Sequence, residues 1–470
     1  MKTFFFYDLE TSGLNPRTDR IMQFAGIRTD EQWQQVGEPI NVLVALTDDI
    51  LPSPDALVVT GISPQKTIDE GYSEAQFAKL LMTEVFTPDT TIVGYNNIRF
   101  DDEFIRHLLW RNFYDPYEWA WREGRSRWDM LDVVRMTRAL RPDGITWPTT
   151  PEGKPSNKLE RLSAENGIVH TTAHDALSDV EALIGVTKLL QQKQPQLFDY
   201  LFSMRHKKAV QQLVNLENKQ PFVYTSGRYG GAHHSTTVAF PLTSGKNGNV
   251  VVYDLRTDPT PFLGLTETQL ASTLHATWEQ RQQPDYVAVP VKELQYNRAP
   301  AVAPLGVLSK GDGWQRIELD EAVIRRHQTL LLAQPGFAET IRSVYEARPE
   351  YAPATDPEAQ LYDGFLLDRD KLRVEAVRNA SEQALADFHP EFVDERLTPL
   401  LLHYKARNFR RCLTEAEQHA WENWREARIA AQLPGFMTAL QRLMADTNPG
   451  TQFMVQELQL WAESVIPIDA

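Results

Sequence analysis

Aromatic and apolar runs near the start of the chain predict three consecutive β-strands. The first covers residues 3–11, TFFFYDLET, and the second covers residues 21–29. The third covers residues 40–46, and short turns with glycine, asparagine and proline separate the strands. Three strands joined by short connections predict a β-meander.

After these strands the pattern is mainly helical. The segment at residues 52–64 is rich in proline and turn residues, and a buried strand is predicted at residues 91–96. Apolar spacing and capping residues predict helices at residues 73–81, 100–110, 130–140, 158–165 and 175–190. A meander followed by alternating helices and strands indicates an α/β domain that ends near residue 195.

The second half of the chain divides again. Between about residues 222 and 308, short β-type runs such as 250–253 and 286–289 alternate with glycine, asparagine and proline. Helical patterns return from Glu321, residues 351–357 read as a linker, and the remainder is helical. We therefore predict three domains, at residues 1–195, 196–350 and 351–470.

Composition narrows the class of protein. A chain of 470 residues with 42% hydrophobic and 24% charged residues is typical of a soluble protein of several domains, and it has no apolar run that predicts a membrane span. The single cysteine, Cys412, excludes a disulfide framework and predicts a reducing cytoplasm. The net charge of −15 argues against a polyanionic partner, although a local basic groove can still hold a phosphate backbone.

Candidate chemistry first arises at Asp8 and Glu10, where the first strand ends. Residues two apart in a strand project from the same face, so these carboxylates lie side by side. Two adjacent anions are unfavourable without a cation between them, and Mg²⁺ or Mn²⁺ prefers carboxylate oxygen. Taken alone, the pair is more typical of a strand that runs into a solvated turn.

Two further signals lie in the same predicted domain. An asparagine-rich turn leads into Phe100 and Asp101 at a helix start, and a later segment carries His174 and Asp179. Each has an ordinary structural explanation, because a helix dipole favours an acid in the first turn and a histidine often caps a helix. Asp102, Glu103 and Asp175 lie beside these positions and are alternative candidates.

In combination, the three motifs resemble the DEDD-type exonuclease superfamily in its histidine-containing variant. They are DLET at residues 8–11, NIRFD at 97–101 and His174 to Asp179. Stretches at residues 94–97, 111–117, 140–142 and 404–409 resemble the bacterial exonuclease I family, so the resemblance extends along essentially the whole chain. It implies an α/β fold: a ribonuclease H-like exonuclease domain with a mixed sheet, a small SH3-like β domain and a C-terminal α-helical domain.

The resemblance also implies an activity. It is the metal-dependent, processive hydrolysis of single-stranded DNA from the 3′ end, with release of 5′-mononucleotides, in DNA repair and recombination. Two cations about 4 Å apart can activate the attacking water, neutralise the phosphate and stabilise the leaving oxygen. The implied cofactor is two Mg²⁺ ions, with Mn²⁺ as a substitute.

Each motif residue receives a role from this resemblance. Asp8, Glu10 and Asp179 would hold the first metal, and Asp8 would bridge to the second. Asp101, preferred over Asp102 because it directly follows the aromatic Phe100, would contribute from outside the ligand shell. His174 would accept a proton from the attacking water, a role suited to an imidazole that titrates near neutrality.

Substrate contacts are predicted from cations and aromatic rings, because each stacked base contributes roughly 1–3 kcal/mol. The segment around residues 403–411 interleaves both types without an acid, and a helix packed into the core remains the alternative. Lys158 opens a predicted helix whose free N–H groups favour phosphate. The predicted substrate-binding residues are Glu10, Lys158, Tyr404, Lys405, Arg407 and Phe409.

Partners and rival functions complete the predictions. The exonuclease I resemblance implies a monomer that binds the acidic, hydrophobic C-terminal tail of the single-stranded-DNA-binding protein, and Arg141 and Tyr200 are the candidate contacts. The nearest rival is an RNA-trimming or proofreading 3′-to-5′ exonuclease of the same superfamily. A rival of another class is a non-catalytic single-strand-binding scaffold, which metal-dependent turnover would exclude.

Overall fold

The N-terminal meander forms as predicted. The computed structural model describes residues 2–170, 175–348 and 352–466. Its first strands, β1 (Thr3–Thr11), β2 (Ile21–Thr29) and β3 (Ile40–Leu43), pair antiparallel in succession. The third strand ends at Leu43, earlier than predicted, because Val44 bridges to Tyr72 outside the ladder.

Two further strands turn the meander into a mixed sheet. β4 (Thr90–Gly94) pairs parallel with β1, and β5 (Ser126–Asp129) completes the order β3-β2-β1-β4-β5. The buried strand at residues 91–96 is therefore confirmed, whereas β5 was not predicted. The mixed sheet expected for this fold class is present.

The predicted helices of this region form close to their predicted bounds. They are α3 (Glu74–Leu80), α4 (Asp101–Arg111), α5 (Met130–Leu140), α6 (Leu159–Glu165) and α7 (Ala176–Lys193). In α3 the Ser73 hydroxyl accepts a hydrogen bond from the Gln76 N–H, and the Gln76 side-chain oxygen accepts one from the Ser73 N–H. Two helices were not predicted: α1 (Pro54–Thr60) lies inside the proline-rich segment and α2 (Pro64–Glu70) begins where that segment ends, and each has proline in its first turn.

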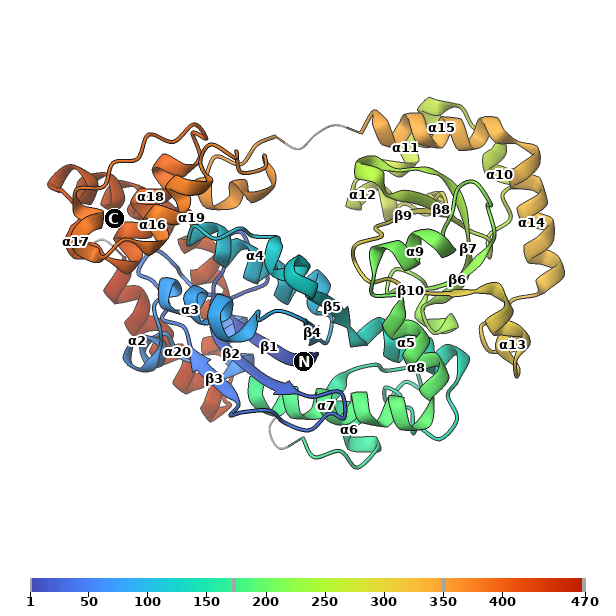
Figure 1. Cartoon of the computed structure of the whole chain (residues 1–470), viewed down its shortest axis with the longest axis horizontal. Coiled ribbons are helices and arrows are strands. Elements are labelled where there is room, and N and C mark those ends of the chain that lie inside the picture. The colour runs from blue at the N-terminus through green and yellow to red at the C-terminus, as the bar shows by residue number, and fades with distance from the viewer. Residues whose placement is uncertain (1, 171–174, 349–351, 467–470) are drawn as a thin grey trace. The chain divides into compact units, whose positions relative to one another are not determined.

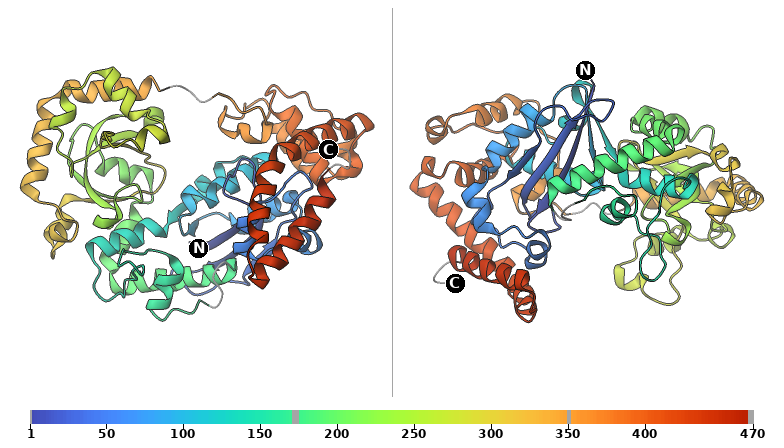
Figure 2. Two further views of the ribbon diagram at one scale, coloured as in Figure 1. Left: turned by 180° about the vertical axis from the view of Figure 1, so that it is seen from behind. Right: turned by 90° about the horizontal axis from the view of Figure 1, so that it is seen from below.

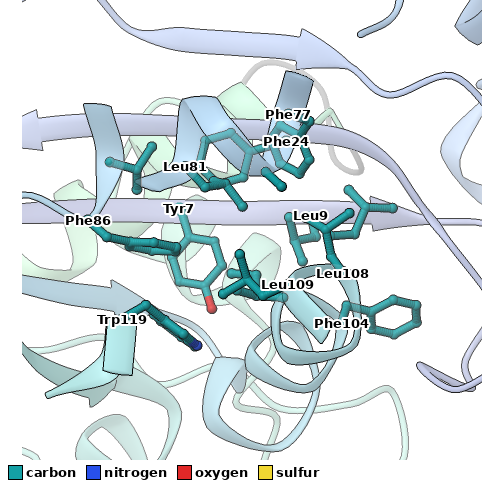
Figure 3. Packing of buried hydrophobic residues seen from close by; sticks show 14 of the residues in the cluster. Tyr7, Leu9, Phe24, Phe77, Leu81, Phe86, Phe104, Leu108, Leu109 and Trp119 are labelled. Carbon is teal, nitrogen blue, oxygen red and sulfur yellow. The ribbon is translucent and has the colours of Figure 1, made fainter. Parts of the chain in front are cut away.

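Alternation along β1 separates an apolar face from the face that carries the acids. Tyr7 and Leu9 pack with Phe24, Phe77 and Leu108, so α3 and α4 cover this side of the sheet (Figure 3). Asp8 and Glu10 point to the opposite face because successive side chains of a strand alternate. The two acids therefore do not disturb the apolar packing of Tyr7 and Leu9 on the other face of the strand.

The C-terminal part is helical, as predicted. It contains α16 (Lys371–Asn379), α17 (Glu382–Ala386), α18 (Leu397–Asn408), α19 (Glu415–Met444) and α20 (Pro449–Val465). The two long helices α19 and α20 lie side by side and pack on α1 (Figure 2). Their apolar side chains form one core cluster with Met22, Leu46 and Leu57.

The central part of the chain contains a five-stranded antiparallel sheet with the order β10-β6-β7-β8-β9 (Figure 1). Its strands are β6 (Phe222–Thr225), β7 (Thr236–Ser244), β8 (Val250–Asp254), β9 (Val291–Leu294) and β10 (Ala301–Pro304). The prediction of a strand at 286–289 is wrong, because that segment has no regular structure and the strand begins at Val291.

Helices of different lengths precede, separate and follow the strands of this second sheet along the chain. They are α8 (Pro195–Ser203), α9 (Lys207–Leu213), α10 (Thr260–Leu263), α11 (Glu267–Leu274), α12 (Trp278–Arg281), α13 (Gly313–Arg316), α14 (Glu321–Ala333) and α15 (Pro335–Glu346). The helical pattern predicted from Glu321 is thus confirmed. None of the described helices combines the length and apolar character needed to cross a bilayer.

The chain folds into two compact units. The first comprises Met1–Arg127, His170–Ile184 and Ala352–Ala470, and the second comprises Trp128–Val169 and Gly185–Tyr351. The first unit therefore contains Asp8, Glu10, Asp101 and Asp179. The three domain boundaries remain a prediction.

Candidate active site

Three carboxylates from distant parts of the sequence meet at the end of β1. Asp8 and Glu10 come from the strand, and Asp179 comes from the first turn of α7. One carboxylate oxygen of each lies within 4.8 Å of those of the other two. Oxygen donors this close are what a hard divalent cation requires.

A strained turn places a fourth acid, Asp101, at the start of α4. Asn96 adopts a left-handed conformation (φ +68°), which asparagine tolerates, and a 3₁₀ turn follows at Asn97–Arg99. A Cβ on Gly94 would lie 2.5 Å from the Cβ of Asn97, so this tight approach requires glycine. Asp101 is only 5% exposed, and its charge acts on both Asp8 and Glu10.

The electrostatics of the four acids favour a bound cation. Burial, followed by the charges of Asp101, Glu10 and Asp179, raises the pKa of Asp8 well above its usual value. Burial and the charges of Asp179, Asp101 and Asp175 raise the pKa of Glu10 to about 8. Protons or a divalent cation can each relieve this repulsion. The oxygen donor set and its charge therefore fit Mg²⁺ or Mn²⁺.

We expect metal to stabilise the protein more at high pH than at low pH. Because the pKa of Glu10 is raised in the folded, metal-free protein, protonated Glu10 contributes to stability. This contribution is fully present at a pH below the usual pKa of 4.5 and is lost as the pH rises through about 8. A cation needs the deprotonated carboxylates. Thermal unfolding with and without Mn²⁺ should show a shift that grows between about pH 6 and about pH 8.5. A Glu10→Gln variant should flatten this pH dependence, and a wild-type shift independent of pH would contradict the assignment.

Asp102, the neighbour of Asp101, has a structural role. Its side chain is fully buried, and the hydroxyl of Tyr7 donates a 2.6 Å hydrogen bond to Oδ1. The amide of Asn97 lies 3.3 Å from the same oxygen, and the Arg127 guanidinium pairs with Oδ2. These contacts occupy both Asp102 oxygens and agree with the choice of Asp101 for the metal site.

The other two alternative acids also have local partners. The Ser178 N–H donates to the Asp175 carboxylate at 3.2 Å, so Asp175 caps the start of α7. Glu103 accepts a 2.9 Å hydrogen bond from the Arg106 guanidinium. Asp175 and Glu103 therefore have structural roles, as a helix cap and as the partner of an arginine, and need not be metal ligands.

Paired variants should separate the two adjacent aspartates. We expect Asp101→Asn to weaken metal-supported turnover by roughly 10–100-fold while the protein stays as stable as wild type. We expect Asp102→Asn to destabilise the fold by about 2 kcal/mol, because the buried Arg127 loses its charged partner. Steady-state kinetics and urea unfolding of both variants test this, and the reverse pattern would assign the site to Asp102.

The predicted base, His174, lies outside the described residues. A different histidine of the same segment, His170, contacts the acid cluster: its Nε2 atom lies 2.6 Å from Asp179 Oδ1. The sequence-based prediction missed His170, although a second histidine just before the third motif was a signal for it.

The cation-rich segment at residues 403–411 supports the alternative of a packed helix. Tyr404 packs edge-on against Phe113 at 5.3 Å, and Phe409 packs against the same apolar cluster. The Lys405 side chain is 1% exposed, and its Nζ donates to Glu417 at 2.5 Å. Tyr404 and Lys405 are therefore core residues rather than DNA contacts, whereas Phe409 is only partly buried and its contact with DNA stays a prediction.

Arg407 belongs to a buried ionic network. Its guanidinium lies 2.9 Å from Asp49 and also pairs with Glu358, and its side chain is 2% exposed. Arg20 lies 2.7 Å from Glu358, and Arg428 lies 3.4 Å from Asp49. The predicted DNA contact at Arg407 is thus also corrected, because its charge is used inside the protein.

The same network contains a second group of potential metal ligands, Asp356, Glu358 and His403. The charges of Arg407 and Arg20 hold the pKa of Glu358 well below its usual value despite its burial. A carboxylate already paired with arginines has little to gain from a cation, and the arginines would repel one. This group is therefore an ion-pair cluster rather than a second metal centre.

Three further predicted residues lie in the second compact unit. The Lys158 side chain is 70% exposed, and its Nζ lies 3.5 Å from Glu160, so its contact with substrate stays a prediction. Arg141 directly follows α5 and donates to the carbonyl of Val307 at 3.0 Å. Tyr200 lies on α8, which packs against α5, and burial raises its pKa to about 12.

Comparison with known families agrees with this site. Residues 5–187 match a family model described as exonuclease. Residues 205–347 match the exonuclease I SH3-like domain, and residues 355–465 match the exonuclease I C-terminal domain. The three models follow the order of the predicted domains.

Individual relatives cover nearly the whole chain. Exodeoxyribonuclease I of Escherichia coli is 38% identical over 99% of this chain and 98% of its own length. The crystal structure of Escherichia coli exonuclease I with a dA16 oligonucleotide superposes with a TM-score of 0.95 at 36% identity, covering 99% of this chain and all (100%) of that one. The zinc-bound form of the complex of the same enzyme with single-stranded DNA gives a TM-score of 0.94 at 36% identity, covering 99% of each chain. This chain therefore belongs to the exonuclease I family and is a nuclease with an exonuclease domain, an SH3-like domain and a C-terminal helical domain.

Proposed function

We propose that this exodeoxyribonuclease degrades single-stranded DNA processively in the 3′-to-5′ direction and releases 5′-mononucleotides. The observation that carries the proposal is the cluster of Asp8, Glu10 and Asp179 within a chain that matches exonuclease I along its length. We also propose, from the same resemblance, a role in DNA repair and recombination and a cytoplasmic location.

Asp8, Glu10 and Asp179 are the residues that would hold Mg²⁺, with Mn²⁺ as a substitute. When bound, such ions polarise the phosphate, lower the pKa of a water and stabilise the leaving oxygen. Asp101 would hold the site in shape from the start of α4, where its buried charge adds to the attraction for cations. Glu10 would also contact the substrate.

His174 is proposed as the group that accepts a proton from the attacking water. An imidazole suits this role because it changes charge near neutral pH. We expect His174→Ala to lower kcat while Mn²⁺ still binds. Equal losses of Mn²⁺ affinity and kcat would instead make His174 part of the metal site.

Labelled oligonucleotides test direction and substrate class. With Mg²⁺, a 3′-labelled single strand should release labelled mononucleotide at once, whereas a 5′-labelled strand should shorten progressively. An excess of unlabelled strand added after binding should not stop digestion of an engaged strand if the enzyme is processive. Early release from a 5′ label would overturn the proposed polarity.

The same assay separates the rival functions. Discrimination against the 2′-hydroxyl depends on the shape of the strand-binding groove, so RNA is a necessary substrate control. Faster digestion of RNA than of DNA would favour an RNA-trimming enzyme. Tight binding of DNA without metal-dependent turnover would favour a binding scaffold.

Arg141 and Tyr200 are proposed to bind the C-terminal tail of the single-stranded-DNA-binding protein. Arg141 directly follows α5, Tyr200 lies on α8, and these two helices pack together; a cation and an aromatic side chain suit an acidic, hydrophobic tail. Fluorescence anisotropy with a labelled tail peptide should show binding to the monomeric wild type and weaker binding to Arg141→Ala. Unchanged affinity in both Arg141→Ala and Tyr200→Ala would reject this surface.

A further inference from the structure

His170 and Asp179 form a contact that the proposed function leaves without a role. The His170 Nε2 atom lies 2.6 Å from Asp179 Oδ1, and the two side chains are 6% and 17% exposed. His170 lies in the connection between α6 and α7, nine positions before Asp179. The contact therefore joins this connection to the first turn of α7.

A carboxylate accepts hydrogen bonds only, so the imidazole must donate from Nε2. A carboxylate has two oxygens with several acceptor sites, so Asp179 can accept this hydrogen bond and also bind a cation. The His170 ring is almost fully buried, so it has little room to reorient and holds the carboxylate in one direction.

Asp179 needs such a constraint because its neighbours repel it. One of its carboxylate oxygens lies within 4.8 Å of a carboxylate oxygen of Asp8 and of Glu10. Without a metal, repulsion favours any rotamer that turns Asp179 away from β1. A donor on Asp179 opposes that rotation and keeps the three carboxylates converged.

We propose that His170 is a positioning residue for the metal site and acts through the Asp179 carboxylate. The proposal rests on the assignment of Asp8, Glu10 and Asp179 as metal ligands. Hydrogen-bond partners of metal ligands orient them, and removing such a partner typically lowers metal affinity by roughly 10–100-fold. This role differs from that of His174, which concerns the proton of the attacking water.

Mn²⁺ titration of the metal-free, full-length protein without DNA tests the proposal. Free Mn²⁺ measured by electron paramagnetic resonance gives the affinity without any turnover. We expect His170→Leu to bind Mn²⁺ roughly 10–100-fold more weakly and His170→Gln, which retains a donor, to recover most of the affinity. His419→Leu, at an exposed histidine of α19, is the matched control and should bind like wild type.

Turnover at saturating Mn²⁺ completes the test. A positioning role predicts that His170→Leu then approaches the wild-type kcat, because excess metal compensates for weaker binding. Wild-type Mn²⁺ affinity in His170→Leu would overturn this inference alone. A kcat that stays about 100-fold low at saturation would also overturn it, since His170 would then act in the chemical step. Wild-type protein that binds no Mn²⁺ would overturn this inference together with the metal assignment.

Discussion

Replacing Asp8 with asparagine is expected to lower turnover on single-stranded DNA by roughly 10³-fold or more, on the order of 4 kcal/mol in the activation barrier. Asp8 belongs to the cluster of three carboxylates that would hold the metal, and the exonuclease I resemblance gives it the role of a ligand to both ions. The variant removes one charge without changing the size of the side chain. Steady-state kinetics with saturating DNA and Mg²⁺ measure the loss.

Stability measurements show whether this loss comes from the chemistry or from misfolding. Asp8→Asn removes a charge from a group of mutually repelling acids, so the metal-free variant should be at least as stable as wild type. Asp69→Asn, at an exposed position of α2, is the matched control and should keep full activity. Asp8→Asn activity within tenfold of wild type would exclude Asp8 from the metal site.

Replacing Glu358 with glutamine is expected to lower the free energy of unfolding by about 3–5 kcal/mol. Glu358 is fully buried and pairs with Arg20 at 2.7 Å, with Arg407, and with His403 at 2.9 Å. The neutral amide keeps the shape but leaves buried guanidinium groups without sufficient negative charge. Urea unfolding of the full-length protein measures the difference.

An exposed carboxylate provides the comparison for Glu358. Glu375 lies 3.9 Å from Arg378, and its side chain is 55% exposed. We expect Glu375→Gln to change the free energy of unfolding by less than about 1 kcal/mol, because water screens a surface ion pair. A Glu358→Gln effect as small as that of Glu375→Gln would show that the network tolerates an uncompensated charge.

Local patterns account for the parts of the fold that were predicted correctly. The aromatic and apolar run at residues 3–9 predicts the central strand, and the spacing of two residues predicts the common face of Asp8 and Glu10, because strand geometry alone decides it. The capping signal at Ser73 likewise marks the start of α3. The segment at 286–289 has the composition of a strand but lacks a pairing partner, which composition does not reveal.

The missed features depend on contacts between distant residues. Basic and aromatic residues at 404–409 have the composition of a DNA-binding face, but Asp49 and Glu358 draw Arg407 into the interior. Asp49 and Glu358 are far from Arg407 in the sequence, so no local pattern predicts this pairing. The His170–Asp179 hydrogen bond spans only nine positions, but it depends on how the connection before α7 folds back on that helix, which the sequence pattern does not reveal.

Anomalous diffraction from crystals of the full-length protein soaked in Mn²⁺ tests the metal site most directly. The site described here predicts a peak bounded by Asp8, Glu10 and Asp179, at the end of β1. A peak at Asp356, Glu358 and His403, with none beside Asp8 and Glu10, would contradict the assignment.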